Sequence, residues 1–264
     1  MLPSGTGPRA VWRDQLAASW VQTAQAGADA LRMAHRIGDG FGELGAFQLT
    51  RRRVGTWLVK GLGIAVAFLV VGNLTILAAS FWARETTATA APSTIEGVEN
   101  LRAVDDRLWR GAAPTTEGYR NLAQAGVTTV VDLRAEDGLE GDAHTVRQLG
   151  MNLVRIPMRD GQVPTAEEVD AFLAATGGAE GRIFVHCGAG VGRTGAMVGA
   201  YQVDVRELSG RDALRRNLAV GPPSLEQIAY VARMDDGRPE KPGTMVTAVS
   251  RVLDAPRRIW SRVG

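Results

Sequence analysis

The chain has 264 residues, a length that fits one domain with appended segments. Its composition, with 45% hydrophobic and 22% charged residues, suits a globular or membrane-tethered protein and argues against wholesale disorder. The 30 Lys and Arg nearly balance the 28 Asp and Glu, so the charge does not indicate nucleic acid as a partner, and the single cysteine excludes an intramolecular disulfide and a multi-thiolate metal site.

Residues 1–60 are predicted to form an amphipathic helical region. Trp12, Leu16, Trp20 and Leu31 recur at loosely helical spacing in a polar background. We expect this region to lie on a surface or to pack on itself, and a partner-binding role is the alternative.

Residues 61–83, "GLGIAVAFLVVGNLTILAASFWA", are predicted to form a single transmembrane helix. The segment contains no charged residue and is long enough to cross a hydrocarbon core of about 30 Å. Trp57 and Trp82 lie near its two ends, where aromatic rings favour the membrane interface. A buried core helix is disfavoured, because such helices seldom stay apolar on every face over this length.

The basic residues around this segment predict its orientation. The cluster at residues 51–53 and Lys60 precede it, whereas Arg84 is the only basic residue between it and Arg102. The positive-inside rule therefore predicts a cytoplasmic N-terminus and a single-pass cell-membrane protein whose later part is extracytoplasmic. A cytoplasmic-facing domain is the alternative. Residues 84–96 are rich in Thr and Ala and are interpreted as a linker.

Residues 97–236 are predicted to form an α/β domain. Val127–Leu133 and Gly181–Cys187 have the composition of buried strands, and Thr165–Thr176 and Thr194–Val205 that of helices, the first with Thr165 as its N-cap. Alternation of strands and helices predicts a central, mostly parallel sheet flanked by helices. Residues 237–264 are interpreted as a basic amphipathic tail that lies on a membrane surface or packs against the domain.

The stretch "VHCGAGVGRTG", Val185–Gly195, contains the only cysteine of the chain. A glycine-rich turn between a strand and a helix directs backbone N–H groups inward, and the helix N-terminus adds a partial positive charge. Arg193 supplies a planar fork for two phosphate oxygens, and the same field stabilises the thiolate of Cys187. The pattern therefore indicates a nucleophile beneath a bound phosphate. A dinucleotide-binding turn does not fit, because the spacing of its third glycine differs.

"HCGAGVGRTG" resembles the signature loop of the cysteine-based protein phosphatase superfamily. "RLWRGAAPT" (Arg107–Thr115), "VVDLR" (Val130–Arg134) and "IPMRDGQVPT" (Ile156–Thr165) resemble its compact tyrosine and dual-specificity-like branch of bacterial type. The resemblance implies that branch's fold, a sheet flanked by helices, with no metal and no cofactor.

The resemblance also implies roles for individual residues. Cys187 would attack phosphorus and form a cysteinyl-phosphate, and Arg193 would hold the phosphate. The Thr194 hydroxyl would stabilise the leaving thiolate, and His186 would hydrogen-bond to the loop. The remaining phosphate-binding positions would be the backbone of Gly188, Ala189, Gly190, Val191 and Gly192.

The family's general acid is an Asp in a loop upstream of the cysteine. Asp160 lies 27 positions before Cys187, in a loop flanked by Gly and Pro between a strand and a helix, and is the candidate. Asp137 and Asp142 are rivals in another polar loop, and Asp132 is interpreted as structural. Gln227 could position water, as in the tyrosine-specific branch.

The predicted function is that of a membrane-anchored phosphatase acting on phosphotyrosine or mixed phosphoprotein substrates. The chain lacks the Trp-Pro-Asp acid loop of the tyrosine-specific branch, so its deep phosphotyrosine pocket is not assumed. Ala189 and Val191 stand where phosphoinositide phosphatases often carry lysines. The alternatives are a lipid-phosphate phosphatase at the bilayer surface and an inactive phosphate-binding module. A rhodanese-like sulfurtransferase is disfavoured by the set His186, Arg193 and Thr194.

Overall fold

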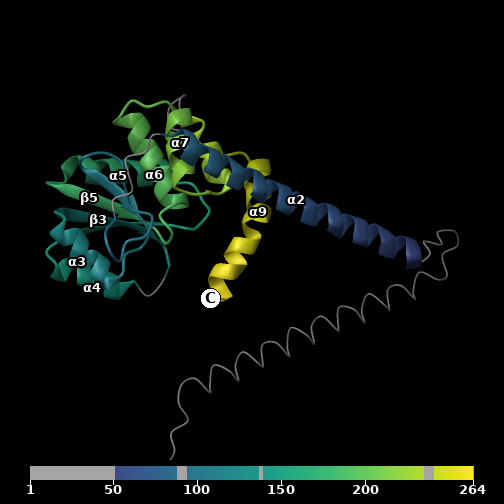
Figure 1. The fold of residues 1–264 in the computed structure, drawn as a ribbon, viewed down its shortest axis with the longest axis horizontal. Coiled ribbons are helices and arrows are strands. Elements are labelled where there is room, and N and C mark those ends of the chain that lie inside the picture. The colour runs from purple at the N-terminus through teal and green to yellow at the C-terminus, as the bar shows by residue number, and fades with distance from the viewer. Residues whose placement is uncertain (1–50, 88–93, 137–138, 235–240, 264) are drawn as a thin grey trace, which may run out of the picture. The chain divides into compact units, whose positions relative to one another are not determined.

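The computed structural model of the chain describes residues 51–87, 94–136, 139–234 and 241–263 (Figure 1). The part of the predicted amphipathic region that covers residues 1–50 lies outside them. The chain divides into two units, residues 1–61 and 62–264, and all contacts below lie within the second unit.

The core of the second unit is a five-stranded sheet with the order β1-β2-β5-β3-β4. Its strands are β1 (Arg102–Ala103), β2 (Leu108–Gly111), β3 (Val127–Arg134), β4 (Asn152–Met158) and β5 (Arg182–His186). Only the pairing of β1 with β2 is antiparallel; β5 pairs in parallel with β2 and β3, and β3 with β4. The mostly parallel sheet predicted from the sequence is therefore confirmed.

Helices cover both faces of this sheet. In Figure 1, α3 (Thr116–Gln124) and α4 (Glu140–Gln148) lie on one face, and α5 (Ala166–Gly178) and α6 (Gly192–Asp204) lie on the other. Neighbouring residues of β5 alternate between the two cores: Phe184 packs with Tyr119 and Leu122, whereas Val185 packs with Phe172 and Met197. Because both faces are covered, the middle of the strand, residues 183–185, is apolar on both sides, as expected for a central parallel strand.

Local capping places the loop that carries Asp160. The Thr165 side chain accepts a hydrogen bond from the Glu168 amide, and the Glu168 carboxylate accepts one from the Thr165 amide. This reciprocal capping box begins α5 and confirms the N-cap predicted from the sequence. It ends the β4–α5 connection at a fixed point, so Asp160 lies in a short loop rather than in a free linker.

The remaining helices form a layer beside α6. They are α7 (Gly210–Val220), α8 (Leu225–Val231) and α9 (Thr244–Val263), the last within the predicted tail. Ser250 of α9 accepts a hydrogen bond from the Glu226 amide and donates one to Asp254, and all three residues are buried. The first half of α9 therefore packs against the domain.

Helix α2 (Arg51–Thr86) contains a stretch, Val59–Thr86, that is long and apolar enough to cross a membrane by length and composition. Most of its large side chains are exposed, but Ile76, Ser80 and Ala83 form a buried face. Ser80 donates a hydrogen bond to the Leu218 carbonyl (2.6 Å), so the last turns of α2 are attached to the end of α7.

Candidate active site

Cys187 directly follows β5, the central strand of the sheet. The loop of residues 188–191 comes next, and α6 begins at Gly192. The carboxyl ends of parallel strands meet at one edge of a sheet, and ligands bind there in open α/β folds. Cys187 is only 3% exposed and lies at that edge.

Four successive carbonyls of this loop are hydrogen-bonded to groups outside it. The donors are the Ala113 amide to Gly188 (2.9 Å), the Asn100 side chain to Ala189 (3.0 Å), and Arg110 to Gly190 (2.9 Å) and Val191 (3.3 Å). Because the carbonyls are held outward, the loop amides are free to face inward, which is the arrangement that receives an oxyanion.

Gly190 is required by the backbone of this loop. Its φ is +71°, and an added Cβ would lie 2.3 Å from the backbone of Gly111. The loop can therefore pack directly on β2 only with glycine at this position.

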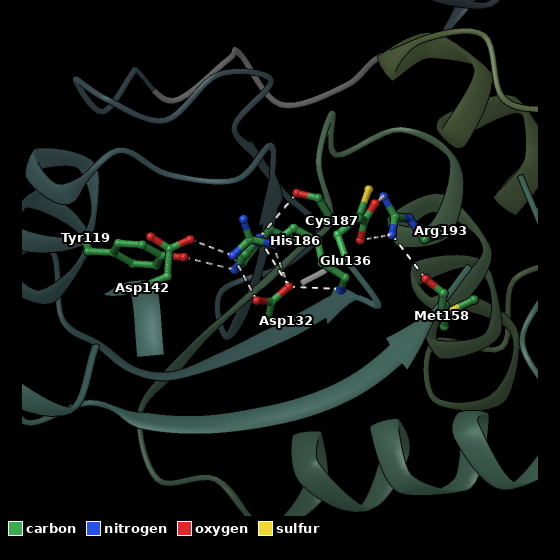
Figure 2. A network of polar contacts seen from close by, with 9 residues as sticks. Tyr119, Asp132, Glu136, Asp142, Met158, His186, Cys187 and Arg193 are labelled. Atoms are coloured by element: carbon green, nitrogen blue, oxygen red, sulfur yellow. Dashed lines mark hydrogen bonds and ion pairs between the residues drawn. The ribbon is translucent and has the colours of Figure 1, made fainter. Parts of the chain in front are cut away.

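Arg193 is the second residue of α6, and its guanidinium points toward Cys187 (Figure 2). Nη1 and Nη2 donate to the two carboxylate oxygens of Glu136 (2.9 and 2.8 Å), and Nη1 also donates to the Met158 carbonyl (3.1 Å). Nε has no hydrogen-bond partner among the described residues. Burial alone would lower the pKa of Arg193, but its hydrogen bonds to Glu136 and the proximity of Cys187 raise the pKa above its ordinary value.

This geometry gives the two edges of the guanidinium different occupants. Glu136 takes the end-on edge, made by Nη1 and Nη2. The side-on edge, made by Nε and the second Nη2 hydrogen, is left for a bidentate oxyanion. Asp160 approaches this edge from the Nε side, with Oδ1 3.5 Å from Nε.

The structure distinguishes between the aspartates that the sequence offers as the general acid. Asp160 reaches Arg193, whereas Asp142 and Asp132 both pair with Arg134 (2.7 and 2.9 Å). Asp137 lies outside the described residues. Asp160 is also the most accessible of the three described candidates, with 62% of its side chain exposed, so it can approach a bound substrate.

His186 lies beneath the loop and is fully buried. Its ring nitrogens are 3.3 Å from the Tyr119 hydroxyl and 3.3 Å from the Cys187 carbonyl, and Nδ1 is 3.9 Å from Asp132 (Figure 2). Burial lowers the pKa of His186 to about 4, although Asp132 opposes the shift. The ring is therefore neutral at neutral pH and is placed to orient the backbone of Cys187.

Thr194 and Gln227 differ in how far their side chains are engaged. The Thr194 hydroxyl is buried and has no hydrogen-bond partner within the described part of the chain. Gln227 accepts from the Ser224 amide (3.0 Å) and donates to the Gln162 carbonyl (3.0 Å). Gln227 thus connects α8 to the loop that carries Asp160, and both the oxygen and the nitrogen of its side-chain amide are hydrogen-bonded.

Two residues that organise the site were not predicted as site residues. Glu136 follows the carboxyl end of β3, the neighbour of β5. The sequence signal that could have identified it was a charged residue shortly after a predicted buried strand. Arg110 lies in "RLWRG" and holds two loop carbonyls. Within the described ranges, no group of three or more His, Cys, Asp or Glu could hold a metal ion.

Comparison with known proteins gives one family model, described as DSP-PTPase phosphatase fused to NAD+ kinase, which matches residues 86–233. Among curated relatives, NAD kinase 2 of Arabidopsis thaliana is 36% identical over 101 residues, 36% of this chain and 10% of that protein. A protein of Invertebrate iridescent virus 3, named as a tyrosine phosphatase, is 30% identical over 118 residues, 42% of this chain and 48% of its own length. The chain thus spans a tenth of one relative and about half of the other.

Two solved structures are among those similar to this chain. The catalytic domain of the PP-IP phosphatase SIW14 from S. cerevisiae is 17% identical with a TM-score of 0.48, over 55% of this chain and 90% of that one. TpbA of P. aeruginosa is 23% identical with a TM-score of 0.43, over 67% of this chain and 99% of that one.

Proposed function

Because the chain belongs to the family described as DSP-PTPase phosphatase fused to NAD+ kinase, we propose that it hydrolyses phosphate monoesters through a cysteinyl-phosphate intermediate. The observation that carries this proposal is the convergence of Cys187, Arg193 and Asp160 at one edge of the sheet. Each supplies one function that the reaction requires: a nucleophile, an oxyanion clamp and a proton donor.

In the first step, the Cys187 thiolate attacks phosphorus and the bond from phosphorus to the leaving oxygen breaks. Protonated Asp160 gives its proton to that oxygen. In the second step, Asp160 as a carboxylate takes a proton from water, the water oxygen attacks phosphorus, and the S–P bond breaks to restore the thiolate. The side-on edge of Arg193 and the loop amides hold the phosphate oxygens throughout.

Substitution of the nucleophile tests the mechanism. Cys187→Ser should abolish hydrolysis of an aryl phosphate while phosphate binding remains, because the loop amides and Arg193 are unchanged. Acid quenching of the unsubstituted chain should trap one phosphate on Cys187, the only thiol, visible by mass spectrometry. Near-normal turnover by Cys187→Ser would exclude the covalent mechanism.

We propose phosphotyrosine or mixed phosphoprotein substrates. Ala189 and Val191 give the loop no cationic side chain for a second phosphate, which supports a singly phosphorylated substrate. The test compares turnover of a phosphotyrosine peptide with that of a phospholipid panel by the full chain in lipid nanodiscs. Hydrolysis of phospholipids alone would overturn this substrate class.

We further propose that α2 anchors the chain as a single pass, with the phosphatase domain outside the cytoplasm. The apolar residues exposed along Leu62–Leu77 support burial in lipid, and the basic cluster at 51–53 supports a cytoplasmic start. Alkaline phosphatase fused after Gly264 should be active in a bacterial host. A silent fusion there, with an active cytoplasmic reporter at the same point, would reverse the orientation.

A further inference from the structure

A second cationic pocket adjoins the catalytic loop through Arg110, which lines the pocket and donates to the Gly190 and Val191 carbonyls of the loop. This cavity has a volume of about 90 Å³ and is lined by side chains from β1, β2, α6 and α7. Three of them are arginines, Arg102, Arg110 and Arg216, and none of the lining residues is acidic. We call it the rear cavity. Its chemistry does not depend on the proposed hydrolysis.

Arg110 is a buried cation with no carboxylate partner among the described residues. It is 3% exposed, and its Nη atoms donate to Asn217 and to the Gly190 and Val191 carbonyls. Its Nε is buried and has no hydrogen-bond partner in the described part of the chain. Burial lowers the pKa of Arg110 to about 10, with Cys187 opposing the shift and Arg102 adding to it. A buried guanidinium with an unused donor favours an anion beside it.

Gln202 supplies an acceptor to the same cavity. Its side chain comes from α6, is 5% exposed and lines the rear cavity, and its Oε1 has no hydrogen-bond partner in the described structure. Arginine donors alone suit any oxyanion. The added acceptor favours an oxyanion that carries a hydroxyl, as a phosphate monoanion does and sulfate at neutral pH does not.

We propose that the rear cavity binds a phosphate group that retains one P–OH, either as inorganic phosphate or as the headgroup of a lipid phosphomonoester. Arg110 Nε and the guanidinium groups of Arg102 and Arg216 donate to the phosphate oxygens, and Gln202 Oε1 accepts from the P–OH. The volume is several times the ~10–15 Å³ that one water needs, so the cavity has room for such a group.

The position of the rear cavity makes it reachable both for inorganic phosphate from solvent and for a lipid headgroup. Arg216 is exposed, so the cavity is reachable from solvent. Val220 also lines it, and the Val220 carbonyl accepts a hydrogen bond from Arg84 of α2 (3.0 Å). The cavity therefore adjoins the end of the candidate membrane helix, where a lipid headgroup would lie.

The first experiment measures phosphate binding with the catalytic loop disabled. We would use two preparations of the full chain in detergent, Arg193→Ala and the unsubstituted chain alkylated at Cys187, so that failure of one to fold leaves the other. Calorimetry should find one bound phosphate in each, and weaker binding of sulfate. Adding Arg216→Ala should weaken phosphate binding about tenfold or more, the scale of one charge-assisted hydrogen bond.

Arg215→Ala is the matched control, because it removes the same charge one residue earlier on α7 from a side chain that does not line the rear cavity. Phosphate binding should be unchanged in this variant. No phosphate bound to either preparation, or equally weakened binding in Arg215→Ala and Arg216→Ala, would overturn the proposal and leave a cavity filled with water. Sulfate binding as tightly as phosphate would overturn the assignment of a P–OH to Gln202.

The second experiment identifies the source. The alkylated chain would be reconstituted in vesicles of phosphatidylcholine alone or with phosphatidic acid. Loss of free-phosphate binding only in the presence of phosphatidic acid identifies the lipid headgroup as the occupant. Unchanged binding in both vesicles identifies inorganic phosphate. Either result supports the site, whereas absence of binding in phosphatidylcholine vesicles overturns it.

Discussion

Glu136 offers a test in which two interpretations of its contact with Arg193 predict opposite changes in kcat/KM. Its carboxylate could compete with substrate phosphate for Arg193, or it could hold the guanidinium in place. The structure favours positioning, because Glu136 takes the Nη1–Nη2 edge and Nε has no hydrogen bond to any described residue. Glu136→Gln should therefore lower kcat/KM for an aryl phosphate.

The magnitude follows from the hydrogen bonds that the substitution removes. Glutamine keeps one acceptor but lacks the charge and the second oxygen, so one charge-assisted hydrogen bond disappears. Because 52% of the Glu136 side chain is exposed, solvent screening places the effect at the low end, about 1–2 kcal/mol or ~5–30-fold in kcat/KM. Glu140→Gln, the same change on an exposed residue nearby, is the control and should have no effect.

The assay is steady-state hydrolysis as a function of pH. Partial burial would raise the pKa of Glu136, but the hydrogen bonds from Arg193 outweigh it and keep the pKa below its ordinary value. The ion pair between Glu136 and Arg193 is therefore fully formed at pH values above the ordinary glutamate pKa. It is lost as pH falls through the lowered pKa of Glu136, and there the kcat/KM values of the variant and the unsubstituted chain should converge. A variant with a lower KM and unchanged or higher kcat would refute positioning and establish competition.

Three further outcomes test the remaining assignments. Asp160→Asn should lower turnover by roughly 10²–10³-fold, less for substrates with very good leaving groups, whereas Asp142→Asn should retain turnover; the reverse pattern would reassign the acid. Arg193→Lys should be severely impaired, because one ammonium group cannot hold Glu136 and two phosphate oxygens together; kinetics near those of the unsubstituted chain would contradict the bidentate role. The pKa of His186 is lowered from 6.5 to about 4, so the unfolding free energy should fall by about 3 kcal/mol as pH falls from 6.5 to 4, because the unfolded chain takes up the proton first. Denaturant titrations of His186→Gln at several pH values should lack this contribution. If the dependence of unfolding free energy on pH is the same in the variant, His186 is excluded as its source.

The sequence predicts most where the signal is local. The buried strand Val127–Leu133 and the N-cap at Thr165 depend on neighbouring residues, and both appear in the structure as β3 and α5. Asp160 could be predicted from the sequence because its loop is bounded by a strand and a capped helix. The structure then brings it within 3.5 Å of Arg193.

Contacts set by strand order could not be predicted in the same way. Glu136 meets Arg193, 57 residues away in sequence, because β3 and β5 are neighbours in the sheet and their following loops share one edge. Without that order, an exposed glutamate after a strand has no assigned partner. Arg110 is similar, since an arginine in a buried strand becomes interpretable only when Gly190 and Asn217 are placed around it.

The end of α7 shows how these non-local contacts combine. The last carbonyls of a helix have no partner within it, and here Ser80 and Arg84 of α2 donate to those of Leu218, Ala219 and Val220. One residue earlier, Asn217 accepts from Arg110, which in turn holds the Gly190 and Val191 carbonyls of the catalytic loop. Hydrogen bonds to neighbouring residues of α7 therefore join the candidate membrane helix to the loop that carries Cys187. The rear cavity lies on this path, because Arg110 and Val220 both line it.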